Sequence, residues 1–202
     1  MQGTLRDVDG MRWMASAMRA AQAQLETATH NLANVTSDGY RRVHATVTLT
    51  GHGLVAQEAT DTAQGGLRMT GRTLDLALVG PGAFRVGDRE TRAGSFVLDR
   101  SGFLADRAGH RVLGVGGSIR LSAEATIDSD GVVRDAGRIA GRLPLPAGTT
   151  VRSGALESSS VDAIGETMSM LTAQRAFETA QKTLVAIDRT RDKAVNDVVR
   201  LK

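Results

Sequence analysis

The feature that most constrains this fold is a long stripe of apolar residues near the C-terminal end of the sequence. From Met170 onward, apolar positions recur at alternating steps of three and four residues, with one slot taken by Arg191. This spacing is typical of a helix that buries a narrow seam against another helix. No Gly or Pro follows Gly165, so we expect one helix from about Ser158 to Lys202, roughly 60 Å long at ~1.5 Å per residue. The seam consists of Met170, Ala173, Phe177, Ala180, Leu184, Ile187, Ala194, Val198 and Leu201.

A second seam with the same spacing lies near the N-terminus, between about Asp9 and Val35. A helix as long as the C-terminal one cannot fold back into a globule of 202 residues and needs a partner of comparable length. We therefore expect the two terminal segments to pair, antiparallel or side by side, and residues 1–8 to be loose. The N-terminal seam consists of Met11, Met14, Met18, Ala21, Leu25, Ala28, Leu32 and Val35.

The middle of the chain has a different composition, because nearly all of its 23 glycines lie between Gly39 and Gly165. Short apolar runs alternate there with Gly-containing turns, which indicates a body of short antiparallel strands. The clearest runs are 43–50, 74–79, 83–86, 95–98 and 111–113. The sequence thus predicts an α+β protein in three parts: an N-terminal helix in 1–40, a central β-rich domain in 41–153 and a C-terminal helix in 154–202.

Local signals place the junctions between these parts. Asn34, Thr36, Ser37 and Asp38 offer side chains that compete for backbone hydrogen bonds, and Gly39 tolerates a positive φ. This stretch predicts a helix end that runs into a tight turn. The serines at 158–160 are candidate N-caps for the second helix.

Composition argues against several classes of function. The chain contains no cysteine, which excludes disulfides and thiol chemistry, and no apolar run approaches the ~18–20 residues of a membrane span. We expect no membrane insertion and, since the N-terminus lacks an apolar signal region, no cleaved signal peptide. The net charge is only +3, and basic and acidic residues are interspersed without a basic stripe. We therefore expect no nucleic-acid binding.

Candidate catalytic residues are equally sparse. His44 and His52 share a segment without a carboxylate at ligand spacing, and Asp75 in an apolar run is more simply a residue that hydrogen-bonds a turn. The Gly-rich stretches at 80–82 and 114–117 precede no convincing helix that could hold a phosphate. We therefore expect no enzyme activity, no cofactor and no metal site.

Three stretches resemble signatures of the bacterial flagellar rod and hook proteins, the axial proteins of the basal body. The first is Asn31-Leu32-Ala33-Asn34, followed by Thr36, Gly39, Tyr40 and Arg41. The second is TGRTLDLA at 70–77, continued by GPGAFRV at 80–86 and TRAGSF at 91–96. The third is GALE at 154–157 with QRAFE at 174–178. Departures from the family pattern at His30, Ala83 and Ser160 remove no part of either seam.

The resemblance implies a structural role as a subunit of the flagellar rod, exported by the flagellar type III apparatus to the extracytoplasmic basal body. Its partners would be further copies, other rod proteins and hook-side axial proteins. The terminal helices would form an inner coiled-coil layer, partly disordered before assembly and ordered by polymerisation. The residues expected at assembly interfaces are Met14, Met18, Leu25, Asn31, Leu32, Asn34, Gly39, Met170, Gln174, Arg175, Phe177, Leu184 and Ile187. Small or polar residues on the remaining helix faces would admit neighbouring subunits, namely Ala17, Ala20, Ala21, Gln174, Ala180 and Gln181.

The position along the rod and the class of function leave alternatives. The short segment from Arg42 to Gly66 favours a proximal rod component, because distal rod proteins of this family usually carry a longer insertion there. A compact distal rod protein is the alternative within the family. A coiled-coil adaptor that binds one partner is the alternative of another class, and it would form a closed dimer rather than a polymer.

Overall fold

The computed structural model describes residues 3–51 and 53–200, with side chains from Gly10 to Lys193 except His52. The chain divides into two compact units. The helical unit comprises residues 1–33, 43–61 and 162–202, and the β unit comprises 34–42 and 62–161. The chain therefore passes between the units four times, after residues 33, 42, 61 and 161. In the described part of the chain, neither helix has an apolar stretch long enough to cross a bilayer.

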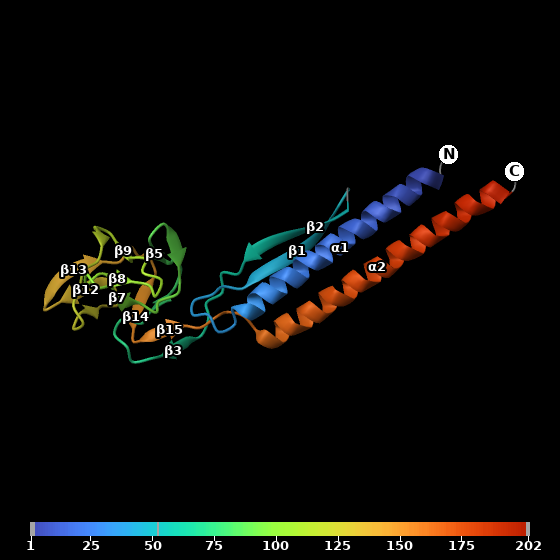
Figure 1. Cartoon of the computed structure of the whole chain (residues 1–202). Helices are drawn as coiled ribbons and strands as arrows, with labels where there is room; N and C mark the ends of the chain where they lie inside the picture. Colours follow the sequence, from blue (N-terminus) through green and yellow to red (C-terminus); the bar gives the residue numbers. More distant parts are fainter. Residues whose placement is uncertain (1–2, 52, 201–202) are drawn as a thin grey trace. The chain divides into compact units, whose positions relative to one another are not determined.

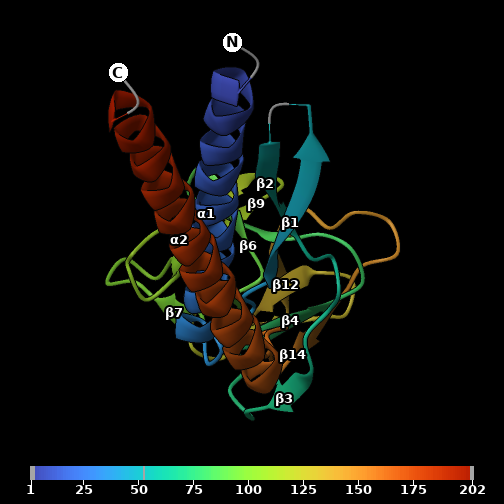
Figure 2. The ribbon, with the colours of Figure 1, turned by 90° about the vertical axis from the view of Figure 1, so that its right-hand side faces the viewer.

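Two long helices form most of the helical unit, α1 (Gly3–Ala33) and α2 (Ala163–Arg200). Thr29 near the end of α1 lies against Met170 near the start of α2, while Gly10 lies beside Ile187. The helices are therefore antiparallel, as the two views of the ribbon also show (Figures 1 and 2). The expectation that 1–8 is loose is wrong for its described part, since α1 already begins at Gly3.

A two-stranded hairpin completes the helical unit. Strand β1 (Val43–Thr50) pairs antiparallel with β2 (Gly53–Thr60), and both strands contact α1. Figure 2 shows α1 between this hairpin and α2. The strand at 43–50 was predicted, but its partner in the weakly patterned 54–66 segment was not. The hairpin also groups with the helices, whereas the sequence placed its residues in the central β-rich domain.

The β unit consists of short ladders, and every pairing among its described strands is antiparallel. The last two strands return to pair with the first two, β14 with β4 and β15 with β3, which closes the unit. The strands are β3 (Leu67–Met69), β4 (Leu76–Val79), β5 (Phe84–Val86), β6 (Arg89–Thr91), β7 (Val97–Leu98), β8 (Leu104–Ala105), β9 (Leu113–Gly114), β10 (Gly117–Ser118), β11 (Thr126–Ile127), β12 (Val132–Asp135), β13 (Arg138–Arg142), β14 (Thr150–Ser153) and β15 (Ala155–Glu157).

The core of the β unit is built from the apolar positions of these strands. Leu76 and Leu78 of β4 are fully buried together with Leu104 and Val112. Phe84 meets Phe96 edge to face, with ring centroids 5.1 Å apart, the geometry that the ring quadrupoles favour. Apart from Leu104, these residues come from the apolar runs that the sequence marks as strands, so the predicted β body is confirmed.

The start of α2 differs from the prediction. The helix begins at Ala163, and Asp162 caps it by accepting hydrogen bonds from the N–H groups of Ile164 and Gly165, both at 3.1 Å. The hydroxyls of Ser159 and Ser160 accept instead from the N–H groups of Val161 and Arg42, so the expectation that the serines cap α2 is wrong.

Candidate functional site

The inner face of α2 carries the predicted seam. Met170, Ala173, Phe177, Ala180, Leu184 and Ile187 are the only described side chains after Glu166 in α2 that are not exposed. Their spacing is the three-and-four alternation read from the sequence, so the seam is confirmed over these positions. Its last three members, Ala194, Val198 and Leu201, lie outside the residues whose side chains are described.

Helix α1 presents its seam to α2 and a second, polar face to the hairpin. Met14, Met18, Leu25 and Leu32 of the seam are half-buried, and Ala28 is buried. The second face comprises Ser16, Ala20, Thr27 and Asn31, which at 100° per residue lie roughly 130° around the helix from the seam. All four are buried. This face was not predicted from the sequence, because its small and polar side chains do not stand out by composition. The spacing of its four members is the only sequence signal that marks it.

Hydrogen bonds from the second face of α1 hold the hairpin. The Ser16 hydroxyl accepts from the Leu54 N–H at 3.1 Å, and the Thr27 hydroxyl donates to a Glu58 carboxylate oxygen at 2.8 Å. The amide of Asn31 bonds both backbone groups of Val43, donating to its carbonyl at 2.7 Å and accepting from its N–H at 2.9 Å. Asn31 is fully buried, so these bonds fix the first residue of β1 against the last turns of α1.

The turn after α1 lies in the β unit and contains two of the predicted interface residues. The Asn34 carbonyl accepts from the Ser37 N–H at 3.1 Å, which forms the expected tight turn. Gly39 has a φ of 67° and donates its N–H to the Glu157 carbonyl at 2.7 Å. A Cβ at Gly39 would overlap the backbone of Arg92 and Ala93, so this position requires glycine on two grounds.

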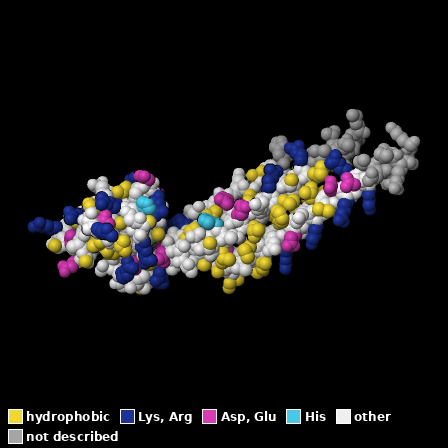
Figure 3. All heavy atoms as spheres, in the orientation of Figure 1, with side chains coloured by type: hydrophobic (Ala, Val, Ile, Leu, Met, Phe, Trp, Pro, Cys, Tyr) yellow, Lys and Arg dark blue, Asp and Glu magenta, His cyan; other side chains and the backbone are white. Residues whose placement is uncertain are grey.

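The outer face of α2 carries exposed apolar side chains. Ile164, Met168 and Leu171 are 78%, 59% and 42% exposed and lie roughly opposite the seam at 100° per residue. Figure 3 shows apolar side chains gathered over the early turns of α2 and Lys and Arg side chains along its later turns. Gln174 and Arg175 are exposed on this helix as well. We name Ile164, Met168 and Leu171 the outer stripe.

Three of the small residues expected to admit neighbouring subunits do not face outward. Ala20, Ala21 and Ala180 are 4%, 4% and 7% exposed, because Ala20 lies on the hairpin face of α1 and the other two belong to the seams. The small side chains instead bring the elements of one chain close together. Ala17 is half-buried, while Gln174 and Gln181 are exposed.

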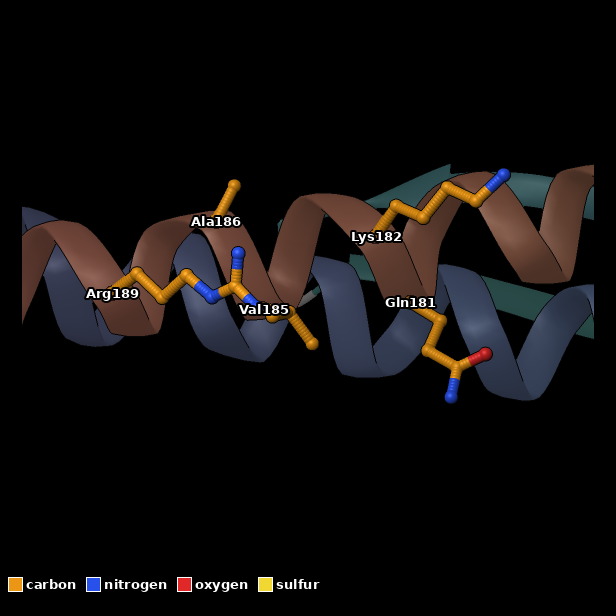
Figure 4. Close-up of a pocket in the computed structure, with 5 residues that line it drawn as sticks. All are labelled: Gln181, Lys182, Val185, Ala186 and Arg189. Atoms are coloured by element: carbon orange, nitrogen blue, oxygen red, sulfur yellow. The ribbon is translucent and has the colours of Figure 1, made fainter.

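A hollow on the surface of α2 does not resemble a catalytic cleft. It has a volume of about 610 Å³ and is lined by Gln181, Lys182, Val185, Ala186 and Arg189, all from α2. Figure 4 shows these side chains projecting from a single helix in different directions rather than converging on one point. A catalytic site needs polar groups that converge on a shared position.

Three candidate catalytic groups, Asp75, His44 and His110, have structural partners, while His52 lies outside the described residues. Asp75 is buried, lies 3.3 Å from the Arg72 guanidinium, and its carbonyl accepts hydrogen bonds from Gly154 and Ala155. His44 lies 3.5 Å from Asp61 and His110 lies 3.1 Å from Asp106. Among the residues that the structure describes, no three His, Asp or Glu side chains gather closely enough to hold a metal ion.

Two aspartates with lowered pKa values organise turns of the β unit. The Asp99 carboxylate accepts from the N–H groups of Ser101 and Phe103, and the Phe103 bond is the largest cause of the lowered pKa of Asp99. Burial raises the pKa of Asp106, but hydrogen bonds from His110 and Arg89 outweigh it, so the net pKa is lowered. Hydrogen bonds to a carboxylate favour its charged form, which explains both directions.

Comparison with family models identifies both ends of the chain. Residues 11–41 match the model described as flagella basal body rod protein. Residues 152–197 match the model described as flagellar basal body rod FlgEFG protein C-terminal. These two ranges contain most of the described seams, the turn at Gly39 and the outer stripe.

Rod proteins match over nearly the full length of the chain, and a hook protein matches about half of it. It is 30% identical to the flagellar basal-body rod protein FlgG of Bacillus subtilis, over 93% of this chain and 96% of that protein. It is 26% identical to the flagellar basal-body rod protein FlgF of Caulobacter vibrioides, over 92% and 95%. It is also 36% identical to the flagellar hook protein FlgE of Brucella abortus, over 52% of this chain and 31% of that protein.

Proposed function

We propose that this chain, which belongs to the family of flagellar basal-body rod proteins, polymerises with further copies and with neighbouring axial proteins into the drive shaft that carries motor torque to the hook. The relatives named above are structural proteins of the rod and hook. The basal body is accordingly the location of this chain, and its transport there by the type III export apparatus is part of the proposal.

The observation that carries polymerisation is the apolar outer stripe of α2. The helix already has a partner, because its seam faces α1. A second apolar face on the opposite side is exposed among the described residues of the helical unit. Clustered exposed apolar residues indicate an interaction surface. In a rod, the occupant of this face is the helix pair of a neighbouring subunit, and the two seams pack as a coiled coil in the inner layer.

We place the chain in the proximal part of the rod. The segment from Val43 to Thr60 forms one hairpin with only two residues between its strands, so this segment carries no long insertion. Distal rod proteins of this family usually carry such an insertion. Relatives named FlgG and FlgF both match nearly the whole chain, so these matches do not separate the two positions along the rod. A compact distal rod protein is therefore the alternative.

The other class of function is a coiled-coil adaptor, and self-association separates it from a rod subunit. An adaptor that used the outer stripe for one partner would form a closed complex of fixed size. A rod subunit forms a heterologous contact that repeats, so its assemblies grow with concentration. Sedimentation velocity of the purified chain over a wide concentration range distinguishes these behaviours.

The decisive experiment is deletion of the gene, followed by isolation and imaging of basal bodies. Loss of motility with rods that stop at the proximal stage supports the proposed position. A complete proximal rod that lacks distal rod and hook supports the distal alternative. Swimming cells with complete basal bodies would show that the chain is not a rod subunit and would favour the adaptor.

A further inference from the structure

We propose that Arg92 and Glu157 are positioning residues that clamp together the segments by which the chain enters and leaves the β unit. The Arg92 Nε donates to Glu157 Oε2 at 2.6 Å, and the two side chains are 4% and 1% exposed. A buried ion pair is weak evidence for stability, because desolvation opposes the attraction of the charges. The ion pair therefore acts mainly through the backbone groups that it holds in place.

Glu157 holds two of the connecting segments at once. Its backbone carbonyl accepts from the Gly39 N–H at 2.7 Å, in the segment that links α1 to β1. Its carboxylate oxygen Oε1 accepts from the Gly65 N–H at 3.2 Å, in the segment that follows β2. Both glycines are tightly enclosed, because a Cβ at Gly39 would overlap the backbone of Arg92, and one at Gly65 would overlap the Ser158 carbonyl.

Arg92 anchors this arrangement to the body of the β unit. Its Nη2 donates to the Leu78 carbonyl at 2.9 Å, at the end of β4. Its Nη1 donates to the carbonyls of Gly80 and Gly82, at 3.0 and 2.7 Å. The planar fork of a guanidinium can satisfy carbonyls on one side and a carboxylate on the other, which a lysine cannot do.

The third connecting segment, 158–161, is tied to the other two by further hydrogen bonds. Glu157 ends β15, and the residues after it lead to α2. Ser158 donates its N–H to the Gly66 carbonyl at 2.8 Å, and Ser160 donates to the Tyr40 carbonyl at 3.0 Å. The Arg42 N–H donates to the Ser160 hydroxyl at 2.9 Å. The three segments that contain the four passages therefore meet in one hydrogen-bonded cluster of the β unit, which includes Glu157 and is anchored by Arg92.

The pair thus makes the ends of the β unit rigid without needing many apolar residues there. If the chain is a rod subunit, rigid connecting segments would transmit torque between its two units better than flexible ones. This consequence rests on the proposed function. The clamp itself is a property of the single chain. Its test can therefore be made on the purified protein and does not depend on rod assembly.

The test is hydrogen exchange of the full-length protein, measured by mass spectrometry, with Glu157→Gln. A glutamine has one acceptor oxygen, so its NH₂ must face either the Arg92 guanidinium or the Gly65 N–H, and one donor loses its partner. We expect amides in 34–42 and 62–66 to exchange on the order of tenfold faster, with those in 76–86 unchanged. The matched control is Arg134→Leu, which breaks an exposed ion pair with Asp128 in the same unit.

Two further variants keep the test decisive if Glu157→Gln folds poorly. Arg92→Lys retains the charge but not the fork. We expect the same segments to loosen, together with 76–86, whose Leu78, Gly80 and Gly82 carbonyls lose donors. Gln64→Ala removes an exposed side chain that donates to the Leu78 carbonyl at 2.7 Å and accepts from the Gly80 N–H at 3.3 Å. It should loosen 62–66 and the Gly80 amide but leave 34–42 unchanged. Unchanged exchange in the connecting segments of Glu157→Gln and Arg92→Lys would overturn the clamp. An equal increase in 76–86 of Glu157→Gln would overturn it as well. Faster connector exchange in a protein whose deletion leaves rods intact would retain the clamp and reject the rod function.

Discussion

Two glycines with similar backbone conformations differ in what surrounds them. Gly39 has φ 67° and is enclosed by the backbone of Arg92. Gly71 has φ 75°, and no atom lies within 4 Å of the position that a Cβ would take there. Gly71→Ala should therefore cost only the left-handed conformation, ~1–2 kcal/mol. Gly39→Ala adds a backbone overlap, which costs a further ~1–3 kcal/mol. Urea unfolding followed by amide NMR signals of the β unit measures both, and equal costs would contradict the enclosure of Gly39.

The lowered pKa values of Asp99 and Asp106 predict how the β unit responds to acid. A carboxyl whose folded pKa lies below its unfolded value of 3.8 contributes stability that is complete above pH 3.8. That contribution is lost as the pH falls below 3.8 towards the folded-state pKa, because the unfolded chain then binds more protons. The urea midpoint of the β unit should therefore decrease with acidification in this range.

Asp106→Asn isolates one of these groups. Asparagine can still accept the hydrogen bonds from the N–H groups of Ala108 and His110, but it loses the charge opposite Arg89. The midpoint of the variant should be lower than that of the unmodified protein at pH 5 and should depend less on pH below 3.8. Asp88→Asn, at an exposed position, serves as the control. Parallel pH curves for the variant and the unmodified protein would reject this account.

At the scale of whole elements, the register of the helix pair is open to direct test. Thr29 Oγ1 lies 4.0 Å from Met170 Sδ, and the chain has no natural cysteine. A Thr29→Cys, Met170→Cys variant should therefore be joined within one molecule by a short bis-maleimide. In the control, Thr29→Cys is combined with Met168→Cys on the outer stripe, which should react little. Equal yields for the two pairs would contradict the antiparallel seam.

The outer stripe gives the second prediction for an element. Met168→Glu places a charge on an exposed face and should leave the folded chain intact, since surface substitutions usually change stability by less than ~0.5 kcal/mol. If neighbouring subunits cover this face, the buried charge should abolish swimming in soft agar. Val115→Glu, at a 73% exposed apolar position of the β unit, tests whether added charge alone matters. Full motility of the Met168 variant would remove the outer stripe from the assembly surface.

The helices were predictable because a seam repeats over many residues, and repetition outweighs any local ambiguity. Strand β2 was not, because its Gln57, Glu58 and Ala59 are exposed and its pairing depends on contact with α1. The cap at Asp162 was missed for a related reason. Three serines precede it with equal capping ability, and only the fold shows that two of their hydroxyls already accept hydrogen bonds elsewhere. The buried partner of Arg92 was equally hidden, since 65 positions separate the two residues.

At the scale of the whole molecule, the two units differ in how much apolar surface they bury. The β unit has a continuous core of fully buried Leu, Val and Phe side chains. From Ala163 to Lys193, by contrast, α2 fully buries only Glu166, Ala173 and Ala180. Small side chains contribute little hydrophobic free energy, at about 25 cal/mol per Å². Most helical stability in proteins comes from tertiary packing, so helices with so little burial are expected to be weakly stabilised in a single chain.

This contrast predicts that the helices order on assembly. In the free subunit, amides of α1 and α2 should exchange at least ~100-fold faster than those of β4 and β5, since local stability follows burial. In polymer assembled from the purified chain, the helices should gain protection while the β unit changes little, because the outer stripe and the remaining helix faces become covered. Met168→Glu provides the control, since its helices should stay unprotected at the same concentration. Helices that are already fully protected in the free subunit would show that the contact between the two seams is sufficient to order them. Assembly would then join helix pairs that are already folded.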